Sequence, residues 1–539
     1  MSLIVLQVGQ AGNQLGQEFF SQAAQYSHSL SKKNDYFNNT VKTRNDNSSK
    51  LPLSVSPYFH KDNYAHSICI DSEPKVVQQL INTQLSTILN ITSKNDSAAR
   101  NSRSSNQTSS SKSNFKPVSK SLSNAIFRRS NILFDQYGRG NNWALGYNGR
   151  KGLKENLTRN ISNDNYSFNS ELTSSQSLSQ QTLECLRIEC EKCDQLNGVI
   201  MMHSSSGGTG SGLGSRIISE ITNSVNDEYS DIYKLTATIT PFAVGDTPLQ
   251  HFNNLLCLSN VYQNVDGMIL FSNEDIKRTI ENSIYKINLG QSIRQMETNF
   301  GFELINRYIS SCLLDLLSPL KESSYYQENF NHNPLIDVNN PAHALAGVQL
   351  SHLITSTCPL SSHKLLECWT TSGLVANSSI KSNQSFNPFA ASWSDEIETL
   401  IRIIPREASH IENEFTDSRT LTSTLYLRGP QTIPNEQINR LTDKLTLALP
   451  PVQWNSFPIK IYESELCPQT STIQSLSICM NRTRHCNYLE SVLLSAKRQF
   501  NVGAYLHWFQ RYDCHETDIK QAFERIQTII DDYSEIVRD

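Results

Sequence analysis

The chain has 539 residues, of which 37% are hydrophobic and 18% charged, and its formal net charge is −4. This composition is typical of a soluble protein of roughly two to four domains, and it excludes a strong overall attraction to nucleic acid or anionic membranes. No run of about 18 apolar residues occurs, so we expect no membrane-spanning helix. The N-terminus, MSLIVLQVGQAGNQLG, lacks the features of a signal peptide.

The twelve cysteines are scattered, and the one tight pair is Cys190 and Cys193 in ECEKC. A zinc site would need a second pair, or histidines at matching spacing, and the sequence contains neither pattern. We therefore expect free thiols in a reducing cytosol.

The N-terminal third begins with alternating strands and helices. Leu3–Val8 is an apolar strand, and the segment after it contains a helix with Leu15, Phe19 and Phe20. His66–Asp71 is a second strand, and residues 72–88 (SEPKVVQQLINTQLSTI) read as a helix.

Two segments have an unusual composition. Residues 93–124 contain twelve serines and mostly basic charges, and residues 155–181 are rich in Asn, Ser and Gln. Neither segment buries enough apolar surface to fold alone. We expect both to be surface insertions; the first is either a solvated loop or a weakly basic arm for an acidic partner.

The middle of the chain continues the alternation. Gly198–Met202, Leu235–Ile239 and Gly267–Phe271 are expected strands. Between the first two, one helical face carries the apolar residues Leu213, Ile217, Ile218, Ile221 and Val225. This α/β alternation predicts a parallel sheet with helices on both faces, and ligands then bind at the carboxyl ends of the strands.

The rest of the chain is mixed. A long helix is expected at Phe302–Leu317, and the segments 351–358 (SHLITSTC) and 422–429 (TSTLYLRG) read as strands. Residues 490–500 and 518–536 read as helices.

A glycine-rich loop, MMHSSSGGTGSGLGSR at residues 201–216, separates a strand from a helix. It is no P-loop, because Leu213 stands where GxxxxGK[ST] requires Lys. It also fails the GxGxxG pattern, and no NKxD motif occurs. Backbone N–H groups at a helix N-terminus still make an anion site without lysine. Alone, the loop is equally compatible with a tight turn that packs helix against strand.

Three further loops favour the anion site. GQAGNQLG (9–16) and the acidic DSEP (71–74) each follow a strand directly, and GRGNNWALGY (138–147) is a third Gly/amide loop. In the predicted sheet all four loops fall on one edge. The acidic loop suits Mg²⁺ held through water.

These four motifs, in this order, resemble the tubulin family over most of the chain. Within the family, EKCD before the third strand, SGGTGSGLGS and GAYLHWF resemble the delta branch. The fold that the resemblance implies is α/β: a parallel-sheet GTP-binding domain, a smaller mixed α+β domain and C-terminal helices. We assign residues 1–300, 301–481 and 482–539 to these three parts.

The resemblance implies a set of nucleotide-binding residues. Those expected at the phosphates of GTP or GDP are Gln10, Ala11, Asn141, Ser204, Gly208, Thr209 and Gly210. Ala11 departs from the Cys of most relatives, which removes a side-chain contact. Glu73 matches the residue linked to Mg²⁺.

The base and ribose have their own expected partners. Asn273 and Asn306 match the residues that recognise guanine, and an Asn amide offers both a donor and an acceptor to its edge. Phe302 matches the ring that stacks on the base, and Asp246 aligns with the loop near the ribose.

In polymerising members of the family, an acidic loop completes the GTPase site of the neighbouring subunit. Here that loop reads NPLIDVNNP, in which Asp337 keeps the first acidic position and is the catalytic candidate. Asn340 takes the place of the hydrolytic glutamate, and an amide is no general base. We expect nucleotide binding with weak activation of hydrolysis in a neighbour.

The function implied is that of a GTP-binding cytoskeletal protein in the cytoplasm, at centrioles or basal bodies. Its expected partners are other tubulins or centriolar and basal-body proteins, with neither nucleic acid nor membrane. A microtubule lattice subunit that hydrolyses GTP on assembly is the alternative. An ordinary nucleotide enzyme is a third reading, but no nucleophile–base pair lies beside the loops, and a lone histidine such as His203 is more often structural.

Overall fold

The computed structural model describes residues 2–40, 57–77, 126–149, 177–223, 232–243, 245, 247–287, 301–318, 321–322, 350–372, 393–405, 418–430, 433–455, 458–464, 467–468 and 474–538. Several expectations lie outside these residues. They concern the insertion at 93–124, residues 155–176 of the second insertion, Asp246, Asp337 and Asn340.

The described strands are β1 (Ser2–Val8), β2 (Ser67–Asp71), β3 (Ile132–Phe134), β4 (Leu196–Ser204), β5 (Tyr233–Thr240), β6 (Gly267–Ser272), β7 (Lys321–Glu322), β8 (Leu365–Thr370), β9 (Thr420–Arg428), β10 (Ile459–Ser464) and β11 (Ser475–Arg482). The described helices are α1 (Gly9–Thr40), α3 (Trp143–Asn148), α4 (Leu178–Glu191), α5 (Gly214–Thr222), α6 (Gln250–Asn264), α7 (Asn273–Ile287), α8 (Phe302–Leu317), α11 (Leu350–Thr357), α12 (Trp393–Ile403), α13 (Asn435–Ala448), α14 (Arg484–Asn501), α15 (Leu506–Gln510) and α16 (Glu516–Arg538), with the short turns η1 (Arg129–Asn131) and η2 (Thr209–Leu213).

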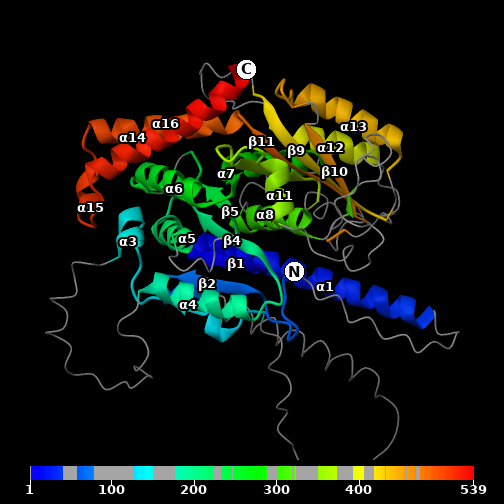
Figure 1. The fold of residues 1–539 in the computed structure, drawn as a ribbon, viewed down its shortest axis with the longest axis horizontal. Helices are drawn as coiled ribbons and strands as arrows, with labels where there is room; N and C mark the ends of the chain where they lie inside the picture. Colours follow the sequence, from blue (N-terminus) through cyan, green and yellow to red (C-terminus); the bar gives the residue numbers. More distant parts are fainter. Residues whose placement is uncertain are drawn as a thin grey trace, which may run out of the picture.

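The described strands form one sheet in the order β3-β2-β1-β4-β5-β6-β8-β11-β9-β10-β7 (Figure 1). From β3 to β8 every neighbouring pair is parallel. The β8–β11 and β11–β9 pairs are antiparallel, and β10 returns to a parallel pairing with β9. The parallel half confirms the predicted sheet, and the mixed half continues it through β8.

Helices cover both faces of the sheet and enclose two apolar cores. The core on one face draws on α1, α7, α8, α11, α12 and α13. The core on the other face draws on α3, α4, α5, α6, α14, α15 and α16. Side chains of β1 alternate between them, since Val5 belongs to the first core and Ile4 and Leu6 to the second. A strand buried on both faces reads as a continuous apolar run, as this one does.

Helix α8 lies in the first core, and its residues from Tyr308 to Leu317 are all buried. Its one buried carboxylate, Asp315, accepts hydrogen bonds at Oδ2 from the hydroxyls of Thr370, Ser372 and Ser477, each at 2.7 Å. The guanidinium of Arg428 donates to the backbone carbonyl of Asp315 at 3.0 Å. These bonds fix α8 against β8, β9 and β11.

Two expectations about elements are wrong. Residues 351–358 do not form a strand, because Leu350–Thr357 is helix α11. The β-branched content pointed to a strand, but the buried residues Leu350, Leu353, Ile354 and Thr357 have helical spacing. The last residues of the 155–181 segment also belong to a helix: Ser177 caps α4, with a capping box to Gln180. Of the helix expected at 72–88, the described part is helical from residue 74 to residue 77.

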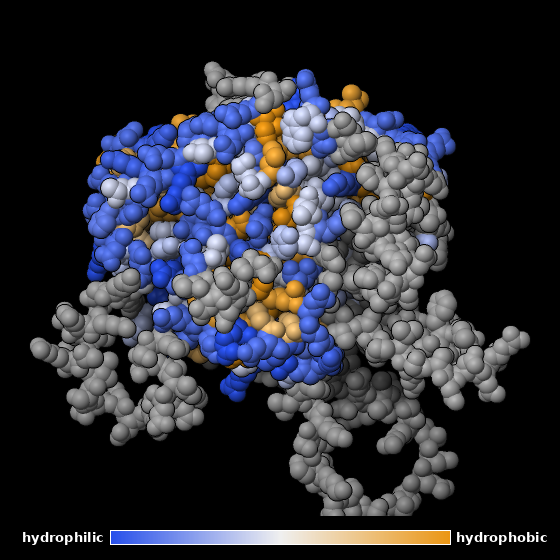
Figure 2. Space-filling model, in the orientation of Figure 1, coloured by the Kyte–Doolittle hydropathy of each residue, from blue (hydrophilic) through white to orange (hydrophobic). Residues whose placement is uncertain are grey.

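The remaining predicted elements are confirmed: those beginning near Leu3, Leu15, His66, Gly198, Leu235, Gly267, Phe302, Thr422, Glu490 and Asp518 all occur. Among the described helices, none combines the length and apolar character needed to cross a bilayer. On the face in Figure 2 the described surface is mainly hydrophilic, with apolar residues in small patches.

Candidate functional site

The four loops singled out in the sequence meet at the carboxyl edge of the sheet. Gly9, at the junction of β1 and α1, has φ +75°, and a Cβ there would lie 2.8 Å from the backbone nitrogen of Gly210. The Ser72 hydroxyl of the acidic loop is hydrogen-bonded to the Thr209 hydroxyl of the glycine-rich loop. A glycine is therefore required at position 9, both for its backbone conformation and for the approach of the second loop.

Asn253 of α6 holds two of these loops together. Its side-chain Nδ2 donates to the backbone carbonyls of Asn141, at 2.6 Å, and Ser206, at 2.9 Å. Its Oδ1 accepts from the Trp143 backbone N–H at 2.9 Å. Because Asn253 is fully buried, all three bonds are shielded from water and set the spacing of the loops.

The Gly/amide loop turns through left-handed backbone positions before α3. Gly140 has φ +53° and Asn141 has φ +49°; Asn tolerates this conformation better than most residues. The next residue, Asn142, caps α3 by accepting from the backbone N–H groups of Ala144 and Leu145. The turn brings Asn141 to the cavity described below.

The glycine-rich loop enters the helical conformation through the π-helical turn η2, and α5 continues from it. His203, at the end of β4, donates from Nδ1 to the Gly210 carbonyl over 3.1 Å, and its Nε2 lies 2.9 Å from the Thr238 hydroxyl. Burial lowers the pKa of His203 to about 4, so the ring is neutral at pH 7. These contacts give His203 a structural role, as expected.

A cavity of about 230 Å³ opens among these loops. It is lined by Ala11, Gln14, Asn141, Ser204, Ser206, Gly207, Ile239, Pro241, Phe242, Gly245, Thr247, Gln250, Asn273, Phe302 and Asn306. Six residues singled out in the sequence are among them: Ala11, Asn141, Ser204, Asn273, Phe302 and Asn306. They come from α1, the Gly/amide loop, β4, α7 and α8, so the fold assembles the site from distant parts of the chain.

One wall of the cavity combines amides with aromatic rings. Asn273, the first residue of α7, is 6% exposed, and its Oδ1 has no hydrogen-bond partner among the described residues. Phe302 is 54% exposed, and the centroid of its ring lies 6.0 Å from that of Phe242. A buried amide oxygen without a partner is costly, and together with an exposed ring it could interact with a ligand that donates hydrogen bonds and presents a flat face.

The other predicted residues lie near the cavity without lining it. Gln10 is exposed in the first turn of α1. Gly208, Thr209 and Gly210 follow directly after the lining residue Gly207. Asp246 is outside the described residues, although its neighbours Gly245 and Thr247 line the cavity.

In the segment after β5, sequence reasoning singled out Asp246 but not the residues that line the cavity. Pro241, Phe242, Thr247 and Gln250 line the cavity, and Gln250 Nε2 donates to the Phe242 carbonyl at 3.1 Å. The signal was available, because this segment also leaves the carboxyl end of a parallel strand.

The acidic loop offers one exposed and one buried carboxylate. Glu73 is exposed, and a Cβ on Gly138 would lie 2.6 Å from its Oε1. The Oδ1 of Asp71 accepts from the Glu73 backbone N–H at 3.1 Å. Burial raises the pKa of Asp71 to about 6 although these hydrogen bonds oppose the shift. The pair fits a cation that Glu73 holds through water, with Asp71 fixing the loop.

Comparison with known proteins identifies this arrangement. Residues 154–281 match the model of the Tubulin/FtsZ family GTPase domain. The tubulin delta chain of Mus musculus is 22% identical, over 99% of this chain and 100% of that protein. The tubulin delta chain of Homo sapiens is 22% identical over 99% of each, and the tubulin epsilon chain of Mus musculus is 22% identical over 99% of this chain and 95% of that protein.

The GTPase-domain match covers β4, β5, β6 and the glycine-rich loop. The same loop, with the parallel sheet and the cavity at its carboxyl edge, is what the motifs predicted. The chain is similar to the tubulin family, and its similarity to the tubulin delta chains extends over nearly its whole length.

Proposed function

We propose that the cavity at the carboxyl edge of the sheet binds GTP or GDP with Mg²⁺. The observation that carries the proposal is the cavity wall formed by Asn273, Asn306 and Phe302. Guanine carries N–H donors on its Watson–Crick edge, which the buried Oδ1 of Asn273 accepts. The exposed Phe302 ring stacks on the face of the base.

The opposite wall accommodates the phosphates. Ser204, Asn141 and the backbone of the glycine-rich loop supply neutral donors, and η2 with α5 presents helical N–H groups there. Mg²⁺, when bound, neutralises phosphate charge, so no lysine is needed at this loop. Glu73 holds the ion through water, and Gln10 and Ala11 border the phosphates from α1. Asp246 is assigned to the ribose.

Analysis of the nucleotide released on denaturation tests this proposal. The full-length protein is purified with Mg²⁺, washed free of unbound nucleotide and denatured, and the supernatant is separated by anion-exchange chromatography. We expect close to one equivalent of GTP or GDP. Release of no nucleotide, from protein that also fails to take up GTP at low and high magnesium, contradicts the proposal; release of an adenine nucleotide contradicts the assignment of Asn273 and Asn306.

At the cellular level we propose a cytoskeletal role at centrioles or basal bodies, or in microtubule organisation, together with other tubulins. The similarity to tubulin delta and epsilon chains supports this role. Tagged protein should colocalise with centriolar markers. Stoichiometric incorporation into microtubules, measured by co-sedimentation, would favour the alternative role as a lattice subunit.

We also propose that the chain activates hydrolysis weakly in a neighbouring subunit, because Asn340 stands where a glutamate is expected and only Asp337 keeps an acidic side chain in that loop. The Asn340→Glu variant should raise GTP turnover in mixed assemblies. Wild-type turnover equal to that of this variant contradicts the idea.

A further inference from the structure

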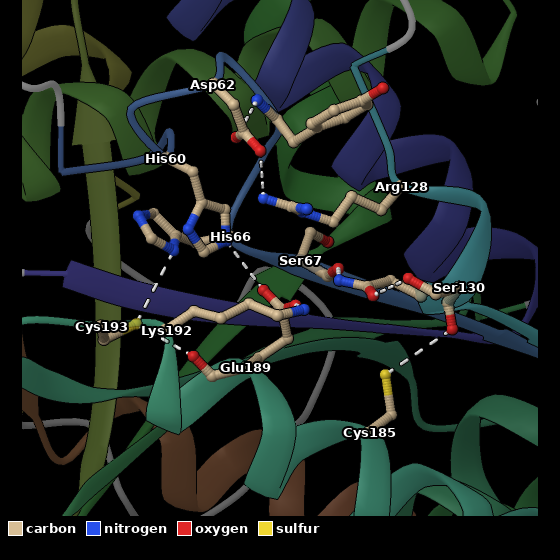
Figure 3. Close-up of polar contacts among 12 residues, drawn as sticks. His60, Asp62, His66, Ser67, Arg128, Ser130, Cys185, Glu189, Lys192 and Cys193 are labelled. Carbon is tan, nitrogen blue, oxygen red and sulfur yellow. Dashed lines mark hydrogen bonds and ion pairs between the residues drawn. The ribbon is translucent and has the colours of Figure 1, made fainter.

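A second cluster of polar side chains lies at the amino-terminal edge of the sheet (Figure 3). His60 and His66 come from the segment that leads into β2, and Glu189 comes from the last turn of α4. One ligand atom from each of the three lies within 4.8 Å of the other two. His60 is 9% exposed, His66 3% and Glu189 0%. The nucleotide cavity lies at the other end of the same strands, so the two sites are separate.

The contacts within the cluster are short and directional. His60 Nε2 lies 2.8 Å from Glu189 Oε2, and the centroids of the two imidazole rings are 3.7 Å apart. The two imidazole rings and the carboxylate therefore offer three ligand atoms within one small, buried volume.

Cys193 lies beside this cluster, in the turn between α4 and β4, and could supply a fourth ligand atom. Its Sγ lies 3.7 Å from His66 Nδ1 and 3.3 Å from the backbone carbonyl of Glu189. The cysteine is half-buried, which lets a metal ion reach the cluster from solvent. The sequence offered no histidines near ECEKC at ligand spacing; the fold brings them from about 130 residues away.

We propose that His60, His66, Glu189 and Cys193 form a structural Zn²⁺ site. Two imidazole nitrogens, one carboxylate oxygen and one thiolate are a donor set typical of tetrahedral zinc. The charges of the Glu189 carboxylate and the Cys193 thiolate balance those of the ion.

Two of the six ligand pairs have distances close to those of a tetrahedral site, and the other ligand atoms must move inward to reach one ion. Ligand atoms around tetrahedral zinc are separated by about 3.3–3.8 Å. The pair formed by Cys193 and His66 is already in this range at 3.7 Å, and the pair formed by His60 and Glu189 opens from 2.8 Å by about half an ångström.

A second interaction orients Glu189. Lys192 Nζ lies 2.6 Å from Glu189 Oε1, so Oε2 remains for the metal while Oε1 stays hydrogen-bonded. Ligands of metal sites are commonly oriented by such outer contacts. The ion would fasten the segment before β2 to the end of α4, at the edge where β1, β2 and β4 begin.

Cobalt substitution tests the site. The full-length chain is stripped with a chelator under a thiol-free reductant and titrated with Co²⁺ alone. We expect one equivalent to bind, with the visible bands of tetrahedral cobalt and a near-ultraviolet thiolate-to-cobalt charge-transfer band. Zn²⁺ should displace the cobalt and raise the melting temperature.

Matched cysteine variants give the control. Cys193→Ser should abolish the charge-transfer band and weaken Co²⁺ binding by more than the roughly 10–100-fold that loss of an outer contact costs. Cys190→Ser, three residues away, should leave the charge-transfer band and the Co²⁺ affinity unchanged. Glu189→Gln should weaken Co²⁺ binding as strongly as Cys193→Ser does. Circular dichroism and the amount of bound nucleotide check that this variant folds. Failure of wild type to bind one equivalent, or a charge-transfer band that survives Cys193→Ser, contradicts the site.

Discussion

At the scale of single residues, Asn273 has opposite effects in the free and the liganded protein. Its buried Oδ1 without a partner is a cost to the nucleotide-free fold. When a donor on a bound base reaches the same oxygen, the hydrogen bond that forms stabilises the complex. If the proposed nucleotide binds here, Asn273 contributes to binding rather than to stability.

We therefore expect Asn273→Ala to weaken guanine-nucleotide binding by about 1–3 kcal/mol, or five- to 150-fold in Kd. The nucleotide-free protein should lose little stability, because the variant removes an unpaired oxygen. Calorimetric titration and urea unfolding measure the two quantities. Asn439→Ala, at an exposed position of α13, is the control and should change neither. Equal losses of affinity and stability would assign Asn273 to the fold alone.

Substitution of Phe302 tests whether its ring stacks on the face of a bound base. Loss of its ring in Phe302→Ala should cost about 1–3 kcal/mol of nucleotide affinity, as stacking contacts between bases and aromatic rings do. Phe302→Tyr keeps the ring and should bind within about twofold of wild type. Displacement of a fluorescent guanine nucleotide measures both. If the Ala variant binds as tightly as the Tyr variant, the ring does not contact the base.

Sequence motifs located the residues that the family pattern marks, such as Asn141 and Ser204, because each stands in or beside a short glycine-rich motif. In the segment of Asp246 they missed Phe242 and Gln250, because the positions of these side chains depend on how α6 packs. They also missed the meeting of His66 with Cys193, which needs β2 and α4 to lie side by side. Contacts of this range are set by packing and leave no local pattern.

At the scale of elements, α6 determines the shape of the cavity through Asn253. Asn253→Ala breaks three buried hydrogen bonds to the loops on either side. We expect it to lower the unfolding free energy by about 1–3 kcal/mol and to weaken nucleotide binding as well. The control is Asn264→Ala at the end of the same helix, where the side chain donates only to Asn260 within its own helix. Unchanged nucleotide affinity in Asn253→Ala would show that the loops hold their spacing without it.

The seam between β8 and β11 is held by a buried ion pair. Oε1 of Glu367 lies 2.8 Å from Nη1 of Arg482, and both side chains are at most 3% exposed. Burial alone would raise the pKa of Glu367, but the charges of Arg482 and Arg484 outweigh burial and lower the pKa from 4.5 to about 2. The lowered pKa means that the ionised form stabilises the fold. This contribution is fully present above about pH 4.5 and is lost as the pH falls toward about 2.

Removing the carboxylate charge in Glu367→Gln should cost about 3–5 kcal/mol at pH 7, because two guanidinium groups remain buried without it. The difference from wild type should shrink as the pH falls below 4.5. Urea unfolding at pH 7, 5 and 4 measures this dependence. Glu398→Gln, which removes an exposed ion pair with Lys444, is the control and should change the stability far less, because solvent screens exposed pairs. A difference for Glu367→Gln that does not vary with pH would contradict the role of its charge.

Element types were predictable where one signal dominated. β1 was read correctly because its apolar residues are nearly continuous, and α8 because its apolar residues recur at helical spacing over 16 residues. α11 was misread because Ile and Thr raise strand propensity, while the helical spacing of its buried residues spans only two turns. Propensity and periodicity conflict in a segment this short, and the packing against β4 and β9 decides the outcome.

At the scale of the whole molecule, the C-terminal helices form part of the cavity's support. Asn142 Nδ2 donates to the Trp508 carbonyl of α15 at 2.9 Å, and Asn254 donates to the Tyr488 hydroxyl of α14 at 2.7 Å. The Tyr488 hydroxyl also bonds to Ser205, which lies between two cavity-lining residues. Hydrogen bonds thus connect α14 and α15 to the residues around the cavity.

Nucleotide binding should therefore slow hydrogen exchange in α14 and α15, far along the chain from the glycine-rich loop. A ligand at 100 times its Kd adds about 2.7 kcal/mol to global stability, which slows every amide that exchanges through global unfolding. The exchange rates with and without nucleotide are therefore compared only for amides that exchange by local opening. In Tyr488→Phe the added protection of α14 should fall, while that of the glycine-rich loop remains. If nucleotide adds the same protection to all amides, in wild type and in Tyr488→Phe alike, then α14 and α15 respond only to the increase in global stability.

The cavity and the cluster of His60, His66, Glu189 and Cys193 lie at opposite ends of β2. Seven residues of extended chain separate His66 from Glu73, which at roughly 3.3 Å per residue is about 23 Å. A cobalt ion in the cluster absorbs visible light, and a fluorescent guanine nucleotide in the cavity emits it. Energy transfer from the fluorescent nucleotide to the cobalt ion would then measure the distance between the two ends of β2. A change in this transfer would reveal a change in that distance when the nucleotide state changes.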